Sequence, residues 1–93
     1  MTIQRINSRG HLSKAVVHNG IAYLAGMTAD DDTQDIKGQM AQVLSAIDET
    51  LAAAGTDKSK LLSSMVYLSD MSVKAEMNAC WMDWIDLDNP PAR

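Results

Sequence analysis

With 93 residues, the chain has room for one domain, because domains usually hold about 100–150 residues. Hydrophobic residues make up 46% of the chain and charged residues 22%, which is ordinary for a globular protein and excludes a disordered or fibrous chain. The net charge of -4 removes the electrostatic attraction that supplies most non-specific affinity for DNA and RNA, so no nucleic acid is expected as a partner.

The same composition bears on location and on the core. No apolar run approaches the length of about 20 residues that a membrane-spanning helix needs, so no membrane association is expected. The single Cys80 cannot form an internal disulfide, and the start Met1–Arg5 lacks the apolar segment of a secretory signal. We therefore expect a cytoplasmic protein. Seven Met and no Phe indicate a pliable core.

The first third of the chain predicts strands. Residues 3–6 form a short candidate strand, and residues 7–11 read as a polar loop. Two apolar runs, 15–18 and 21–25, then flank Asn19-Gly20, the dipeptide that best tolerates the two positive φ angles of a type I′ turn. We expect a hairpin here.

An amphipathic helix follows. Its apolar stripe has a 3.6-residue period and comprises Ile36, Met40, Val43, Leu44, Ile47 and Leu51. We expect the carboxylates of residues 30–32 to lie at its N-terminus, where free backbone N–H groups attract negative charge, and Gly55 to end it. The spacing of a calcium-binding EF-hand loop is absent. Asp48 and Glu49 lie off the stripe and are expected to face solvent.

The last third predicts a strand and a second helix. Residues 61–68 are β-prone and apolar on both sides of the pleat, which favours a central strand. Asp70 or Ser72 can cap the following helix, which Asn89-Pro90-Pro91 must end. The apolar stripe of this helix comprises Val73, Met77, Cys80, Trp81 and Trp84.

The element order is therefore β-β-β-α-β-α, which predicts an α+β fold with two helices packed on one face of a mixed sheet. The other face of the sheet is apolar as well and needs a cover, so we expect a homo-oligomer. The second helix delivers no further strand before Arg93. Residues 1–93 are thus expected to be one domain that is short at its C-terminus.

Few residues suggest chemistry by themselves. His11 and His18 have no partners at the spacing of zinc ligands, so no metal site is expected. Cys80 lies on an apolar helical stripe, where a thiol is usually a buried hydrophobe rather than a nucleophile. Arg93 follows a rigid Pro90-Pro91-Ala92 segment and suits bidentate capture of a carboxylate, although composition alone favours a frayed, solvated terminus over this role.

Several segments of the chain form a pattern when they are taken together and in order. They are Gly20–Gly26, Gln39–Leu44, Ala53–Gly55, Val66–Met71, Met77-Asn78 and Pro91–Arg93. Together these segments resemble the RidA (YjgF) family over nearly the whole chain. The resemblance implies a chorismate-mutase-like fold, assembled as a homotrimer with ligand pockets between subunits.

The resemblance also implies an activity. Active members of this family are enamine/imine deaminases, which hydrolyse reactive 2-imino acids of the 2-aminoacrylate type to 2-keto acids and ammonia, without a cofactor or a metal. By this resemblance Arg93 holds the substrate carboxylate, Asn78 lies near the pocket and Gly26 forms part of its wall. The implied partners are small 2-imino or 2-keto acids.

Departures from the family pattern keep other functions open. Ala25 stands where archetypal deaminases carry Ser, and Leu12 stands where they carry Tyr, so two polar groups of the pocket are missing. The family also continues beyond the position of Arg93 for two strands. The alternatives are a non-catalytic binder of small carboxylates with the same fold, or an inactive truncated product. The older family labels of ribonuclease and translation inhibitor find little support in an acidic chain.

Overall fold

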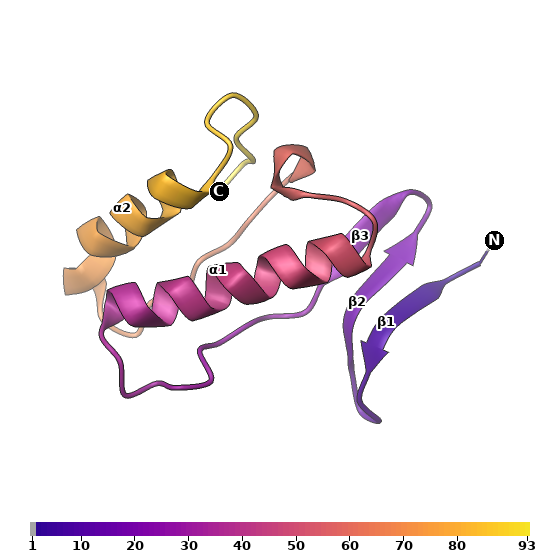
Figure 1. Cartoon of the computed structure of the whole chain (residues 1–93), viewed down its shortest axis with the longest axis horizontal. Coiled ribbons are helices and arrows are strands. Elements are labelled where there is room, and N and C mark those ends of the chain that lie inside the picture. The colour runs from indigo at the N-terminus through magenta and orange to yellow at the C-terminus, as the bar shows by residue number, and fades with distance from the viewer. Residues whose placement is uncertain (1) are drawn as a thin grey trace.

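The computed structural model describes residues 2–93, and it has the α+β composition that the sequence predicts. A three-stranded sheet lies at one end of the molecule and a pair of helices extends away from it (Figure 1). The molecule is flat, with extents of 44 × 34 × 18 Å. None of the helices in residues 2–93 is long and apolar enough to cross a membrane.

The sheet contains β1 (Gln4–Ser8), β2 (Ser13–His18) and β3 (Ile21–Leu24) in the order β1-β2-β3, with both pairs antiparallel. The predicted hairpin between β2 and β3 is confirmed. Its turn residues Asn19 and Gly20 have φ angles of 53° and 76°, the two positive values that a type I′ turn requires. The first strand begins and ends later than the predicted range 3–6.

Helix α1 (Ile36–Ala53) occupies the predicted position, but its N-terminal cap differs from the prediction. The side chain of Asp35 accepts a hydrogen bond from the Gly38 N–H at 2.9 Å. The expected acidic cap at residues 30–32 is wrong, because Asp31 instead accepts from Thr33 and Gln34 within the preceding loop. At the other end, Gly55 has a φ of 81° and ends the helix as predicted.

Residues 61–68 do not form the predicted central strand. The segment makes one isolated parallel bridge, Ser63 to Ala92, and the three-stranded sheet of residues 2–93 is antiparallel rather than mixed. The side chains nevertheless alternate between two sides, as they do in a strand. Val66 and Leu68 pack against the helices, while Tyr67 between them is 85% exposed. The segment is extended and pleated, but no strand of the described residues lies beside it to complete a ladder.

A 3-10 turn, η2 (Met71–Val73), leads into α2 (Lys74–Trp84). Asp70, one of the two predicted caps, caps this turn by accepting from the Ser72 N–H at 2.9 Å. The predicted cap of the helix itself is wrong, because the N-cap residue of α2 is Val73, which makes no side-chain capping bond. The helix ends at Trp84 because Ile85 is already extended, several residues before the proline pair.

The core is small and lies between the two helices. Its buried members are Met40, Leu44, Met77, Trp81 and Ile85. The buried residues Ile6 and Ala15 of the sheet are not part of this cluster. The total accessible surface of 6531 Å² exceeds by about 1,200 Å² the roughly 5,300 Å² expected for a folded monomer of this mass. The described chain therefore leaves more surface uncovered than an ordinary monomer of this mass does.

Candidate functional site

Arg93 is held next to the aromatic core of α2. Its guanidinium carbon lies 5.5 Å from the centroid of the Trp81 ring, within the range of a cation–π contact. The preceding residue is also fixed, since the Ala92 N–H donates to the Leu62 carbonyl at 3.1 Å and the Ser64 N–H donates to the Ala92 carbonyl at 2.8 Å. Arg93 is thus exposed but anchored, which favours a binding role over a frayed terminus.

Asn78 lies one helical turn before Trp81 on α2 and is half-buried. Its side-chain oxygen is buried and accepts no hydrogen bond within residues 2–93. A buried polar atom without a partner costs about 1–3 kcal/mol. The side-chain oxygen of Asn78 can therefore accept a hydrogen bond from a group outside residues 2–93.

Ala25 and Gly26 follow β3 directly. The Ala25 N–H donates to the Lys14 carbonyl at 2.9 Å, which continues the hairpin pairing by one residue. Gly26 is exposed, and a Cβ added to it would meet nothing within 4 Å. Neither residue contributes a side-chain polar group, so this part of the predicted site offers backbone groups only.

Leu12 lies in the loop between β1 and β2, two residues before Lys14, the hydrogen-bond partner of Ala25, and it is 41% exposed. It lines a hollow of about 370 Å³ together with residues of β1, β2 and their loop: Arg5, Ser8, Gly10, His11, Ser13 and Val16. Arg93 and Asn78 do not line this hollow. Within one chain the structure therefore does not bring all predicted site residues into one pocket.

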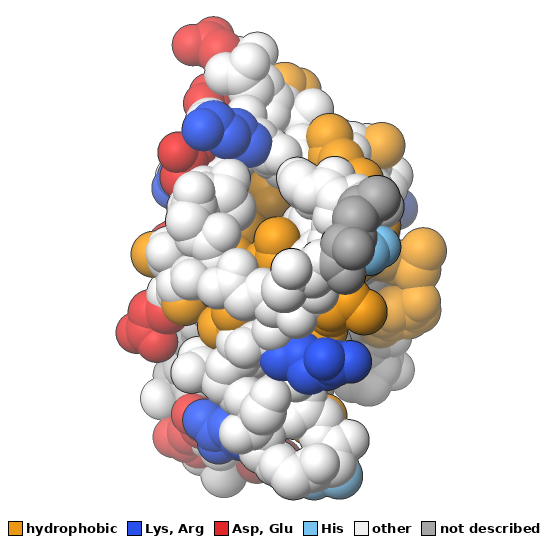
Figure 2. Space-filling model, turned by 90° about the vertical axis from the view of Figure 1, so that its right-hand side faces the viewer, with side chains coloured by type: hydrophobic (Ala, Val, Ile, Leu, Met, Phe, Trp, Pro, Cys, Tyr) orange, Lys and Arg blue, Asp and Glu red, His pale blue; other side chains and the backbone are white. Residues whose placement is uncertain are grey.

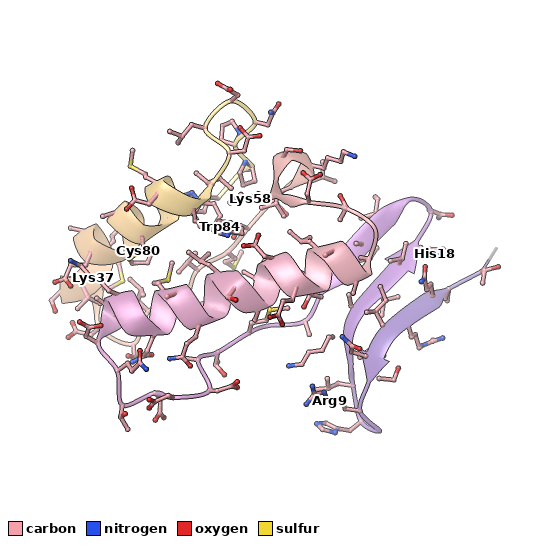
Figure 3. The ribbon with its side chains drawn as sticks, in the orientation of Figure 1. Arg9, His18, Lys37, Lys58, Cys80 and Trp84 are labelled. Carbon is pink, nitrogen blue, oxygen red and sulfur yellow. The ribbon has the colours of Figure 1, made fainter. Side chains whose placement is uncertain are left out.

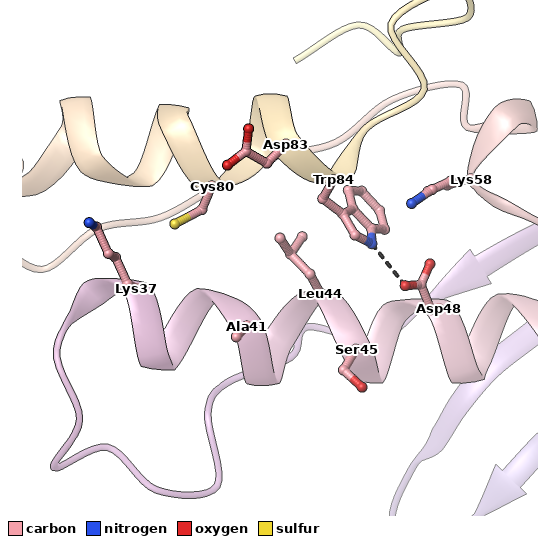
Figure 4. A pocket seen from close by; sticks show the side chains of 9 residues that line it. All are labelled: Lys37, Ala41, Leu44, Ser45, Asp48, Lys58, Cys80, Asp83 and Trp84. Atoms are coloured by element: carbon pink, nitrogen blue, oxygen red, sulfur yellow. Dashed lines mark hydrogen bonds between the residues drawn. The ribbon is translucent and has the colours of Figure 1, made fainter.

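A second hollow of about 440 Å³ lies between α1 and α2 (Figure 4), and the sequence did not predict it. The Trp84 indole N–H donates to the Asp48 carboxylate at 2.9 Å, and the Lys58 ammonium lies 5.0 Å from the centroid of the Trp84 ring. Asp48 is exposed, as expected, and it also accepts this hydrogen bond from Trp84. Cys80 lines the same groove and is half-buried rather than buried.

The titratable residues do not assemble a metal centre. Among residues 2–93, no three His, Cys, Asp or Glu side chains lie close enough together to hold a metal ion. Figure 3 shows His18 in the sheet, apart from Cys80 and Trp84 on α2. The Nδ1 atom of His18 is buried and makes no hydrogen bond within the described chain. His11 is exposed and its Nδ1 lies 3.2 Å from the Arg9 carbonyl.

Apolar side chains are exposed on β3 and on residues 65–67. Tyr23 on β3 is 57% exposed, and Met65 and Tyr67 in the extended segment are 73% and 85% exposed. Figure 2 shows apolar side chains gathered on the side of the molecule that carries the sheet. Exposed apolar area of this kind usually marks a contact with another protein surface.

The contact between Arg93 and Trp81 is the part of the site that sequence reasoning missed. Trp81 was assigned to the core from its helical spacing, and that assignment is confirmed by its 8% exposure. Nothing in the local pattern indicates that a buried ring also meets a cation twelve positions later. Only the path of the chain after α2 brings the two together.

Known proteins resemble this chain over its whole length. The family model described as Endoribonuclease L-PSP matches residues 2–93. A RutC family protein of Haemophilus ducreyi is 43% identical over 91 residues, which cover 98% of this chain and 78% of that protein. The RutC family protein YoaB of Escherichia coli is 34% identical over 93 residues, which cover 100% of this chain and 81% of that protein.

The fold matches as well. The crystal structure of a YjgF family member from Neisseria meningitidis superposes with a TM-score of 0.96 at 38% identity, covering 100% of this chain and 77% of that one. About a fifth of each relative lies outside the matched part. The match of the family model, the curated relatives and the superposition lead to one conclusion: the chain belongs to the endoribonuclease L-PSP family, the RidA/YjgF family that its motifs resemble.

Proposed function

We propose that this protein hydrolyses small 2-imino acids to 2-keto acids and ammonia, as a RidA-like enamine/imine deaminase. The proposal rests mainly on Arg93, which follows α2 in the chain, is exposed, and has its guanidinium in contact with the Trp81 ring. A planar guanidinium with free N–H groups matches a carboxylate better than any other side chain does. The carboxylate is the group that all these substrates share.

The proposed reaction depends more on holding the substrate in position than on strongly acidic, basic or nucleophilic side chains. Arg93 binds the carboxylate, and water then adds to the adjacent imine carbon to form a carbinolamine. The C–N bond breaks, the nitrogen takes up a proton, and ammonia leaves with the 2-keto acid as the other product. Fixing the substrate by its carboxylate lowers the entropic part of the barrier. In this proposal the side-chain oxygen of Asn78, which has no hydrogen-bond partner within residues 2–93, accepts a hydrogen bond from the water or from the substrate nitrogen.

We further propose that the site is completed in a homotrimer. Leu12 and Arg93 do not share a hollow within one chain, and apolar side chains on β3 and residues 65–67 are exposed. A neighbouring copy that covers this surface would bring the loop of Leu12 to the Arg93 end of another subunit. The surplus exposed area of about 1,200 Å² is of the order that subunit interfaces bury. The single Cys80 and the lack of disulfides suit a cytoplasmic location.

A second function is favoured by one specific observation. Ala25 offers no hydroxyl and Leu12 offers no phenol, so the polar groups that would orient the water are fewer than in the archetypal deaminases. A protein of this kind would bind 2-keto acids through Arg93 without turning over 2-imino acids. Binding and turnover must therefore be measured separately.

The test uses imines made in situ by an amino-acid oxidase, with 2-keto acid formation as the readout. We expect the wild-type chain to accelerate 2-keto acid release and Arg93→Ala to abolish the acceleration. Lys74→Ala is the matched control, because it removes an exposed cation from the start of α2, the helix that carries Trp81. Equal rates for wild type and Arg93→Ala would contradict the clamp.

Calorimetric titration with 2-ketobutyrate separates the two functions. Binding without acceleration supports the carboxylate binder, whereas binding with acceleration supports the deaminase. The absence of any binding by the wild-type chain contradicts both.

A further inference from the structure

We infer that Trp81 is a positioning residue for Arg93: its buried ring carries one face of the guanidinium and leaves the N–H edge free for a substrate carboxylate. The inference rests on the proposed function for its ligand. The contact itself can be tested without a ligand.

The ring of Trp81 is itself held in place. It is 8% exposed and belongs to the core between α1 and α2. On one side it meets Trp84, with ring centroids 5.6 Å apart and planes tilted by 54°. The Trp84 indole is fixed in turn by its 2.9 Å hydrogen bond to Asp48 on α1. A series of contacts thus runs from α1 through both rings to Arg93.

The backbone supports the same arrangement from the other direction. Ala92 makes two backbone hydrogen bonds, one with Leu62 and one with Ser64. Because Arg93 is bonded directly to Ala92, these hydrogen bonds also restrict the position of the Arg93 Cα atom. From this backbone position the Arg93 side chain reaches the Trp81 ring. The backbone before Arg93 is therefore fixed, and the guanidinium carbon of Arg93 lies 5.5 Å from the centroid of the Trp81 ring.

This arrangement has a chemical advantage for a carboxylate site. An arginine that is fixed by an ion pair spends its N–H groups on that partner, whereas one supported by an aromatic face keeps them. The long side chain also loses rotamer freedom before the ligand arrives, so less entropy is lost on binding. Trp81 should therefore strengthen binding of the carboxylate without touching the reacting imine carbon.

The first experiment replaces the ring and measures ligand affinity. We expect Trp81→Leu to weaken the Kd for 2-ketobutyrate by about tenfold, the size of a partly desolvated cation–π contact. Trp81→Phe keeps an aromatic face and should restore most of the affinity. In the deaminase assay the loss should appear mainly in KM, with kcat changed less. Leu and Phe variants that both bind as tightly as wild type would overturn the inference and leave the proposed function intact.

Because Trp81 is a core residue, its substitution alone can impair folding, so a second measurement keeps the native ring. In a Trp84→Phe background Trp81 is the single tryptophan of the chain, and its emission reports on its surroundings. We expect Arg93→Ala to change the emission intensity or maximum in the absence of ligand, while Lys74→Ala leaves both unchanged. Identical spectra with and without Arg93 overturn the inference whether or not the protein binds any ligand.

The two measurements also separate the possible failures. An emission change with Arg93→Ala, combined with no 2-ketobutyrate binding by wild type, supports the contact and contradicts the proposed function. An emission change on titrating 2-ketobutyrate into the Trp84→Phe protein, absent after Arg93→Ala, supports both together.

Discussion

Ala92 lies beside Ser63 in a parallel bridge, although the two residues are far apart in the sequence and α2 lies between them. Its N–H donates to the Leu62 carbonyl and its carbonyl accepts from the Ser64 N–H. This bridge is what fixes the chain next to Arg93. It also shows that residues 62–64 accept a parallel neighbour, even though they do not belong to the three-stranded sheet.

The bridge between Ser63 and Ala92 can be disrupted by removing the backbone N–H of Ala92. Ala92→Pro deletes the N–H that donates to Leu62, and its fixed φ remains compatible with an extended chain. We expect weaker carboxylate binding because Arg93 loses its anchor, measured by titration with 2-ketobutyrate. Ala92→Ser keeps the N–H and should bind as wild type does. Equal affinity of the Pro variant and the wild type would show that the bridge does not position Arg93.

Two glycines form a matched pair in the hairpin region. Gly20 has a φ of 76°, where a side chain is strained, although a Cβ would meet nothing within 4 Å. Gly20→Ala should therefore lower the free energy of unfolding by about 1–2 kcal/mol for backbone reasons alone. Gly26 has open space and no such φ, so Gly26→Ala should leave stability unchanged or raise it slightly. Urea unfolding of both variants checks the difference, and equal losses would contradict the turn geometry.

The two-helix core should be sensitive to its methionines. Met77 is 3% exposed, and Met77→Ala should cost about 2–5 kcal/mol of unfolding free energy through lost burial and the remaining cavity. Met82 on the same helix is 59% exposed, so Met82→Ala should change stability by less than about 0.5 kcal/mol. Thermal unfolding monitored by circular dichroism compares them. A small effect at Met77 would show that the helix pair contributes little to the fold.

One acidic residue should show an altered titration. The Ser59 hydroxyl and the Ser59 N–H both donate to the Asp57 carboxylate, the latter at 2.8 Å, and together they hold the pKa of Asp57 below its ordinary value of 3.8. Because the folded pKa is the lower one, the stabilisation is present above pH 3.8 and is lost as the pH falls through the folded pKa. Ser59→Ala should raise the pKa of Asp57.

The Asp57 titration can be followed through its carboxyl carbon by NMR. Ser45→Ala, on a different element, is the control and should leave the pKa of Asp57 where it is in the wild type. A pKa that Ser59→Ala does not change would show that the hydroxyl makes no bond to Asp57 in solution.

The exposed apolar surface predicts the effect of a charge at its centre. Tyr67 is 85% exposed, so Tyr67→Glu should cost the monomer little and should disrupt a trimer that buries this side chain. Sedimentation of the wild type as a trimer and of the variant as a smaller species is the expected result. Met82→Glu, exposed on α2, should leave the assembly intact. A wild-type chain that stays monomeric at all concentrations would contradict the proposed assembly.

The sequence predicted the local features of this fold well. Asn19-Gly20 and Gly55 require particular φ angles whatever surrounds them, so the hairpin and the end of α1 could be assigned directly. The apolar stripe of α1 repeats over five turns, and such a pattern has few alternatives. The cap was harder, because Asp31 and Asp35 are equally suitable side chains and only the loop path selects Asp35.

The non-local features could not be predicted in the same way. Residues 61–68 have the composition and the alternation of a strand, but a strand also needs a neighbouring strand, and local sequence does not determine that neighbour. The contact of Arg93 with Trp81 likewise depends on how the chain turns back after α2. Resemblance to a family singled out Arg93 and Asn78, whereas Trp81 has no sequence signal beyond its place in the core.

Two of the five residues at the centre of the helix pair, Met40 and Met77, carry thioethers instead of hydrocarbon branches. Conversion of either sulfur to a sulfoxide would introduce a strong dipole into a layer of apolar side chains. Oxidation of these two sulfurs would therefore weaken the packing of α1 against α2, whereas the hairpin of β2 and β3 contains no methionine and would be spared.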